Sequence, residues 1–167
     1  IIQNFGLGTD EFDDNKFQRF VEEREKENKD KTTQGIFAPW MMYKEDFEVI
    51  GGHDPLFAPM ELEDSDIFNR FHLKGYELIQ SRDSYCYHMT CRGSRFKDGL
   101  EIEKEIPLAD GTIWYKPKDS QEYLDLRNNK FREWWRKWGT NVLHDDLMMP
   151  VVAPKYDNNK NLYSELV

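Results

Sequence analysis

Cysteine is scarce in this sequence, since only Cys86 and Cys91 occur among its 167 residues. Two thiols are too few to form a disulfide scaffold. The sequence also has no apolar run that approaches the length needed to span a bilayer, and it has no recognisable signal peptide. We therefore expect a cytoplasmic protein without an integral membrane segment.

Basic residues are in deficit, with 23 Lys and Arg against 32 Asp and Glu and a net charge of −9. This balance argues against a nucleic-acid groove as the main surface. A hydrophobic content of 38% and an aromatic content of 14% are typical of a globular chain long enough for one domain with a core. Because the first residue is Ile, we also expect the sequence to be a fragment of a longer protein.

Apolar residues at helical spacing predict three helices. The first begins at Asp13 or Asp14, either of which can cap it, and the second covers residues 63–74. The third covers residues 120–138, with Gly139 as its stop. Its apolar side is expected to consist of Leu124, Phe131, Trp134, Trp135 and Trp138. The tryptophans serve either as core or as a platform on which a sugar stacks.

Short strands are predicted between these helices. Residues 35–43 (GIFAPWMMY) are expected to form a buried strand, broken or at a sheet edge at Pro39. Residues 76–81 and 84–89 are expected to form two more, and residues 110–115 (DGTIWY) indicate a hairpin. A weaker apolar pattern with Phe5 indicates a short strand near the N-terminus. We expect a single domain over residues 1–149, followed by a polar tail over residues 150–167.

The start of the second helix is unusually acidic (ELEDSDIFNRF, residues 61–71). At 100° per residue, Glu63 and Asp64 lie over the apolar side formed by Ile67 and Phe68, whereas Asp66 points further away. Carboxylates at a helix N-terminus can simply cap it and interact with the macrodipole. Carboxylates placed over a buried stripe have raised proton affinity, which suits a general base. Both interpretations stay open on the residues alone.

These residues carry a resemblance to a known family. The segments GGHDPLF (51–57) and ELEDSDIFNRFHLKGY (61–76) resemble the acceptor-side motif of inverting GT-A glycosyltransferases of family 2, and ED-DIFNR is similar to that of the β-1,4-galactosyltransferases. SYCYH (84–88) ends where this family has a metal-ligand histidine, and FREWWRKWG (131–139) resembles its late aromatic helix. The resemblance covers about residues 35–139.

The resemblance implies a transfer of sugar from a nucleotide-sugar donor, such as a UDP-sugar, to an acceptor hydroxyl of a carbohydrate with inversion. Asp64 would be the catalytic base, and Glu63 would orient the acceptor. His88 would bind Mn²⁺ or Mg²⁺ beside the diphosphate, and the imidazole favours Mn²⁺. The residues implied in acceptor binding are Gly51, Gly52, Trp40 and Asp66.

The implied fold is α/β, a partial GT-A-like fold with a short mixed sheet and flanking helices. Its nucleotide-binding half is missing from the sequence, because the only candidate for the D-x-D motif is TDEFDD (9–14), which is explained more simply as a helix cap. We therefore expect this chain to be inactive or weakly active by itself. The alternative is a non-catalytic carbohydrate-binding or self-associating module, whose homo-oligomer would cover the surface of the missing half.

Two other interpretations concern cysteine and histidine. Cys86, His88 and Cys91 have a spacing that could hold zinc, but no second pair completes four ligands. The simpler expectation is that both cysteines are small buried apolar residues. The remaining histidines are expected to be structural or exposed, with His72 completing the core on the Phe68 side; they are His53, His72 and His144.

Overall fold

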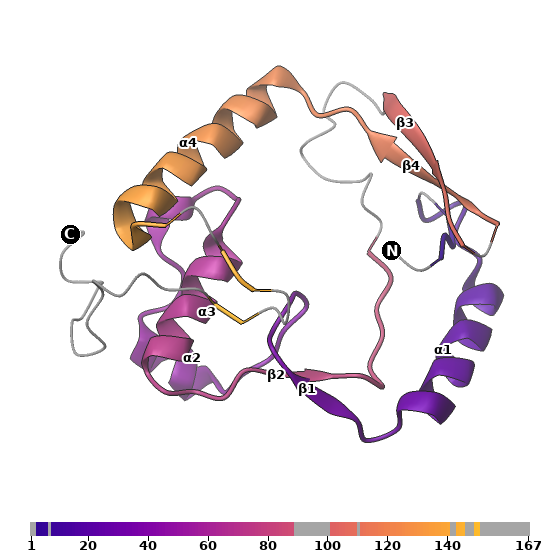
Figure 1. Ribbon diagram of the computed structural model, residues 1–167, viewed down its shortest axis with the longest axis horizontal. Helices are drawn as coiled ribbons and strands as arrows, with labels where there is room; N and C mark the ends of the chain where they lie inside the picture. The colour runs from indigo at the N-terminus through magenta and orange to yellow at the C-terminus, as the bar shows by residue number, and fades with distance from the viewer. Residues whose placement is uncertain are drawn as a thin grey trace. The chain divides into compact units, whose positions relative to one another are not determined.

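The computed structural model describes residues 3–6, 8–88, 101–109, 111–140, 143–145 and 149–150. The chain divides into two compact units: unit 1 is Ile1–Lys31 with Arg82–Asp125, and unit 2 is Thr32–Ser81 with Leu126–Val167. Within the described ranges the fold is mixed α/β, with four α-helices and two antiparallel sheets of two strands each (Figure 1). The expectation of a single glycosyltransferase-like domain over residues 1–149 stays a prediction.

Unit 1 begins with a buried aromatic anchor, Phe5, followed by helix α1 (Asp14–Asn28). The Asp13 side chain accepts a hydrogen bond from the Lys16 amide at 2.9 Å, so the predicted cap is confirmed. Phe5 packs against Phe17 with ring centroids 5.3 Å apart. Residues 3–6 and 8–12 form no strand, so the strand expected there is absent from the described part of this segment.

Unit 1 also contains a β-hairpin and a segment that packs on Phe5. Strands β3 (Ile102–Pro107) and β4 (Ile113–Pro117) form the predicted hairpin, with Glu105 opposite Tyr115 (Figure 1). Residues 84–88 belong to no strand or helix, so the strand predicted for 84–89 is wrong over its described part. The Tyr87 ring packs on Phe5, and its hydroxyl lies 2.7 Å from the Gly6 carbonyl oxygen. These side-chain contacts hold the segment where strand pairing was expected.

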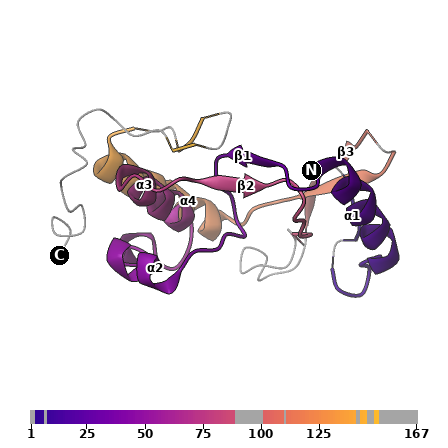
Figure 2. The same ribbon diagram turned by 90° about the horizontal axis from the view of Figure 1, so that it is seen from below.

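In unit 2, β1 (Thr32–Gln34) and β2 (Ile79–Ser81) form a short antiparallel ribbon, with Thr33 opposite Gln80 (Figure 2). The strand expected over residues 35–43 is wrong, since pairing stops at Gln34. Gly35 has φ 109°, and Pro39 has no N–H to give to a ladder. The segment instead packs Ile36, Trp40 and Met42 against the core.

Three helical segments follow in unit 2: α2 (Lys44–Ile50), the 3₁₀ turn η1 (Pro55–Phe57) and α3 (Glu63–Leu73). The predicted glycine turn ends α2, with Gly51 at φ 85°. A side chain on Gly52, at φ 69°, would lie 3.2 Å from the Phe47 ring. The helix predicted for residues 63–74 is confirmed, and Ile67 and Phe71 are buried as expected.

Helix α4 (Gln121–Trp138) belongs to unit 1 up to Asp125 and to unit 2 from Leu126. Its C-terminal half lies beside α3 in unit 2 (Figure 1). Trp134 and Trp138 are fully buried with Phe57, so they are core, whereas Trp135 is 57% exposed and does not share their side of the helix. No helix in the described parts of the chain is apolar and long enough to cross a membrane.

The core of unit 2 consists of two clusters of buried residues. One joins Ile50 of α2 to the apolar side of α3 and to Leu78. The other contains Phe57, Trp134 and Trp138, against which Leu62 and Leu73 pack from the two ends of α3. Helix α3 therefore has apolar neighbours on two sides, and this explains why six consecutive residues, Asp66 to Phe71, are buried.

Candidate functional site

The chain enters α3 through an unusual backbone. Glu61 (φ 77°) and Leu62 (φ 69°) are both left-handed, although neither is glycine. A left-handed non-glycine residue costs on the order of 1–2 kcal/mol, so other contacts must hold this turn. Leu62 packs on the Phe57–Trp134–Trp138 cluster, and the Glu61 Oε2 atom lies 4.0 Å from Arg127 Nε. These contacts with η1 and α4 position the first turn of α3.

Asp64, the predicted base, is half-buried in that first turn. The indole Nε1 of Trp40 donates a hydrogen bond to its Oδ1 at 3.0 Å. The structure thus brings together two residues that the resemblance assigns to one site. Within the described ranges, no hydrogen bond is found at the other carboxylate oxygen, Oδ2.

Glu63 is also half-buried and lies in an electrostatically unfavourable position. Burial raises the pKa of this carboxyl group above its ordinary value of 4.5, and the negative charges of Asp64 and Glu61 raise it further. A backbone N–H and the charge of His53 oppose these effects without cancelling them. Glu63 therefore holds a proton more readily than an exposed glutamate does.

The position of the Asp66 side chain differs from the prediction. Its side chain is 0% exposed rather than turned away from the core. Arg70 Nε lies 2.9 Å from Oδ2, while Lys137 Nζ at 2.7 Å and Trp138 Nε1 at 2.9 Å both contact Oδ1. A direct contact between Asp66 and an acceptor is inconsistent with this enclosure. The residue anchors α3 to α4 instead.

Asp54 completes a buried ionic quartet, which consists of Asp54, Asp66, Arg70 and Lys137. Lys137 Nζ lies 2.6 Å from Asp54 Oδ2, so one ammonium group joins two carboxylates. Burial by itself would raise the pKa of Asp54, but the hydrogen bond from Lys137, the Leu56 amide and the nearby cations together lower it below 3.8. The quartet thus encloses two carboxylates and two cationic side chains, whose charges balance.

Arg70 connects this quartet to the glycine turn. Its guanidinium donates to the Ile50 carbonyl at 2.7 Å and to the Gly52 carbonyl at 2.6 Å. The forked guanidinium thereby holds the C-terminal end of α2 against α3. Gly51 and Gly52 therefore have a structural role in this turn, and their predicted contact with an acceptor stays a prediction.

Sequence reasoning missed the quartet, although its members lie within the quoted motifs. Asp54 stands in GGHDPLF and Lys137 in RKWG, but they are 83 positions apart. The Asp66–Arg70 spacing of i, i+4 on one helix is the local signal that was available. Nothing local indicates that Lys137 reaches the same carboxylate.

His88, the predicted metal ligand, is exposed in unit 1, and the residues before it form no strand. Because Asp64 belongs to unit 2, a shared cleft for the two residues stays a prediction. Cys86 is an exposed free thiol, not a buried apolar residue, and Cys91 lies outside the described residues. His72 is exposed as well, so it does not complete the core. Among the side chains that the structure describes, no group of three or more His, Cys, Asp or Glu could hold a metal ion.

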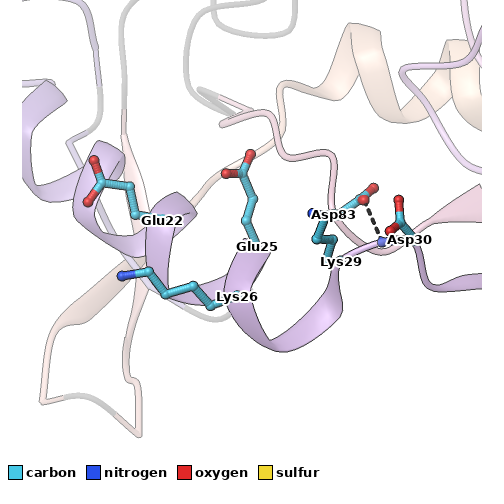
Figure 3. Close-up of a pocket in the computed structure, with 6 residues that line it drawn as sticks. All are labelled: Glu22, Glu25, Lys26, Lys29, Asp30 and Asp83. Atoms are coloured by element: carbon cyan, nitrogen blue, oxygen red, sulfur yellow. Dashed lines mark hydrogen bonds between the residues drawn. The ribbon is translucent and has the colours of Figure 1, made fainter.

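A groove of about 480 Å³ lies on α1 in unit 1 (Figure 3). Four carboxylates and two ammonium groups line it; they are Glu22, Glu25, Asp30, Asp83, Lys26 and Lys29. The Asp83 side chain accepts a hydrogen bond from the Asp30 amide at 2.9 Å. Its excess of negative charge is unfavourable for a nucleotide diphosphate, so this groove does not have the chemistry of a donor site.

Comparison with family models, curated protein sequences and solved structures gave no significant match to this chain.

We predict that Lys137→Met strongly destabilises the protein. The substitution removes the cation between Asp54 and Asp66 and leaves two buried carboxylates close together. The expected loss is about 3–5 kcal/mol in the free energy of unfolding, measured by urea denaturation. Arg136→Met is the matched control, because Arg136 is exposed and its ion pair with Glu133 is local to α4. Equal losses in both variants would show that the quartet contributes little.

We predict that Glu63→Gln stabilises the protein at neutral pH. Because the folded-state pKa of Glu63 is raised above 4.5, its contribution to stability is fully present below that pH and is lost as the pH rises through the folded-state pKa. The variant should therefore unfold at a higher urea concentration than the wild type at about pH 7, and the difference should disappear at about pH 4. Glu48→Gln on the exposed surface of α2 is the control. A gain that is the same at both pH values would contradict a protonation effect.

Proposed function

We propose that this chain is the acceptor-side portion of an inverting glycosyltransferase with a GT-A-like fold. The ordered motifs, GGHDPLF, ELEDSDIFNRF and RKWG, are the sequence basis of the proposal. The observation that carries it is the arrangement at α3: Asp66 is turned inward into the ionic quartet, whereas Asp64 is half-buried with one oxygen bonded by Trp40. If the acidic residues served only to cap the helix, Asp64 and Asp66 would not need such different surroundings.

The proposed reaction uses Asp64 as the general base. Its free carboxylate oxygen takes the proton of an acceptor hydroxyl while that oxygen attacks the anomeric carbon of the donor sugar. The new glycosidic bond forms as the bond to the nucleotide diphosphate breaks, and the diphosphate leaves with the electron pair. Attack from the face opposite the leaving group inverts the anomeric centre. Glu63, with its raised pKa, orients the acceptor as a neighbouring hydrogen-bonding group.

The donor in this proposal is a nucleotide sugar such as a UDP-sugar, accompanied by Mn²⁺ or Mg²⁺. A divalent cation would neutralise charge on the diphosphate, and His88 would provide one ligand to it. One exposed imidazole does not make a metal site, and the described side chains offer no cluster that completes it. No step of the reaction is therefore derived through a metal.

A second candidate function is a non-catalytic module that binds carbohydrate or associates with itself. It is favoured by exposed apolar side chains in unit 2, namely Phe37, Met41, Tyr43 and Val49. Exposed aromatic rings can stack on sugars or pack against another copy of the chain. A module of this kind has no need of an ionised Asp64, so the substitution described next separates the two functions.

We predict that Asp64→Asn lowers turnover by about a hundredfold or more, because an amide cannot accept the proton. The protein should be expressed as encoded, with any preceding segment, and release of nucleoside diphosphate should be measured over a panel of nucleotide sugars and carbohydrate acceptors. Donor affinity should change little. Asp14→Asn, an exposed aspartate in the first turn of α1, is the matched control and should keep full activity. Near-normal turnover of Asp64→Asn would leave Asp64 as a helix-terminal charge only.

We also predict that the 167-residue chain by itself transfers sugar poorly or not at all. The TDEFDD segment does not supply a D-x-D motif at the end of a strand, since Asp13 caps α1. Calorimetric titration with UDP-sugars in the presence of Mn²⁺ should give little heat of binding. Rapid turnover of a nucleotide sugar by the purified chain would contradict the assignment of the donor site to a separate segment.

A further inference from the structure

Trp40 lies in a segment that is fixed to unit 2 by alternate side chains. Ile36, Trp40 and Met42 pack against the core formed by α2 and α3, whereas Phe37 and Met41 are exposed. The Trp40 ring lies 5.8 Å from the Phe68 ring at 82° and 5.8 Å from the His53 ring at 59°. The edge contact with Phe68 and the tilted contact with His53 restrict how the indole can turn.

We infer that Trp40 is a positioning residue for Asp64 and not, as the resemblance implies, an acceptor-binding residue. The inference rests on the proposed function. The indole Nε1–H donates a hydrogen bond to Oδ1 of Asp64 at 3.0 Å, so this oxygen is already bonded within the protein. The other oxygen, Oδ2, is thereby selected to accept the proton of the acceptor hydroxyl.

The chemistry of an indole suits this task. An indole N–H is a donor only, so it can bond a carboxylate oxygen but cannot compete with Asp64 for the proton of the acceptor. A hydrogen bond to an ionised acceptor is also stronger than one between neutral groups. Since Phe68 lies on the same helix as Asp64, the ring contact and the hydrogen bond hold Trp40 to one turn of α3.

The geometry argues against a sugar platform at Trp40. A platform needs an open aromatic face, but this ring is half-buried and has Phe68 and His53 as neighbours. Loss of Trp40 should therefore affect the orientation of the base more than the affinity for the acceptor. In kinetic terms, kcat should fall while the acceptor KM stays nearly constant.

The first test does not depend on activity. Exchange of the Trp40 indole N–H with solvent is followed by NMR in the 167-residue chain, and the resonance is assigned by its loss in Trp40→Phe. We expect Asp64→Ala to accelerate this exchange about tenfold or more, because the hydrogen-bond acceptor is gone. Glu48→Gln, on the exposed surface of α2, should leave the exchange unchanged.

The second test uses the active protein as encoded. Trp40→Phe keeps an aromatic ring against Phe68 but removes the donor, and we expect kcat to fall by about 10- to 100-fold with little change in the acceptor KM. The double variant Trp40→Phe/Asp64→Asn should be no slower than Asp64→Asn, because the two residues act as a unit. Trp135→Phe is the matched control, since Trp135 is an exposed tryptophan of unit 2.

The outcomes separate the two proposals. Unchanged indole exchange in Asp64→Ala overturns the positioning role, even where Asp64→Asn has lost its turnover. A raised acceptor KM with unchanged kcat in Trp40→Phe also overturns it and makes Trp40 an acceptor-binding residue. Near-normal turnover of Asp64→Asn overturns the proposed function, and the positioning role with it, although the hydrogen bond itself would still be seen by NMR.

Discussion

Unit 2 depends on one buried contact, that of the Lys137 ammonium group with the carboxylates of Asp54 and Asp66. Through it, α4 is fixed both to the segment that leads into η1 and to the first turn of α3. Arg70 extends the same network to the glycine turn after α2. Enclosing four charges is costly, and it becomes tolerable only because their signs balance and each group has hydrogen-bond partners. Removal of any one of these groups would therefore leave a buried charge without its partner.

The acidic start of α3 combines residues with different physical roles. Asp66 is fully enclosed and structural, whereas Asp64 is half-buried and bonded by Trp40. Burial and the negative charges of Asp64 and Glu61 raise the pKa of Glu63, so its ionised form is disfavoured where it lies. A residue whose ionised form is disfavoured by its surroundings is typical of a functional site, although structural networks can also perturb carboxylates. Within the proposed function, the base therefore lies in the sequence between Glu63, whose pKa is raised, and the fully enclosed side chain of Asp66.

The sequence predicted those elements whose signals are local. Apolar spacing predicts all three long helices; the Asp13 cap supports α1, and the glycines that follow support α3 and α4. Residues 35–43 and 84–89 were predicted as strands from β-propensity, but they find side-chain partners in place of ladders, with Trp40 on Asp64 and Tyr87 on Phe5. The prediction that Asp66 points away from the core is wrong, because a helical wheel shows on which side of the helix a residue lies but not which sides are covered by other elements. Its partner Lys137 lies 71 positions further along the chain, beyond any local pattern.

The strained turn before α3 shows how the distant contacts act on the candidate site. Glu61 and Leu62 both have positive φ, and neither has the conformational freedom of glycine. Such a backbone persists only where its surroundings determine it, and here Leu62 packs on the cluster that contains Phe57 and the α4 residues Trp134 and Trp138. The same helix holds Asp66 through Lys137 and Trp138, four residues beyond Leu62. The first turn of α3, which carries Glu63 and Asp64, is therefore fixed by α4 on both sides. The late aromatic helix consequently positions the carboxylates without itself having to contact a substrate, and this accounts for Trp134 and Trp138 being core rather than a sugar platform.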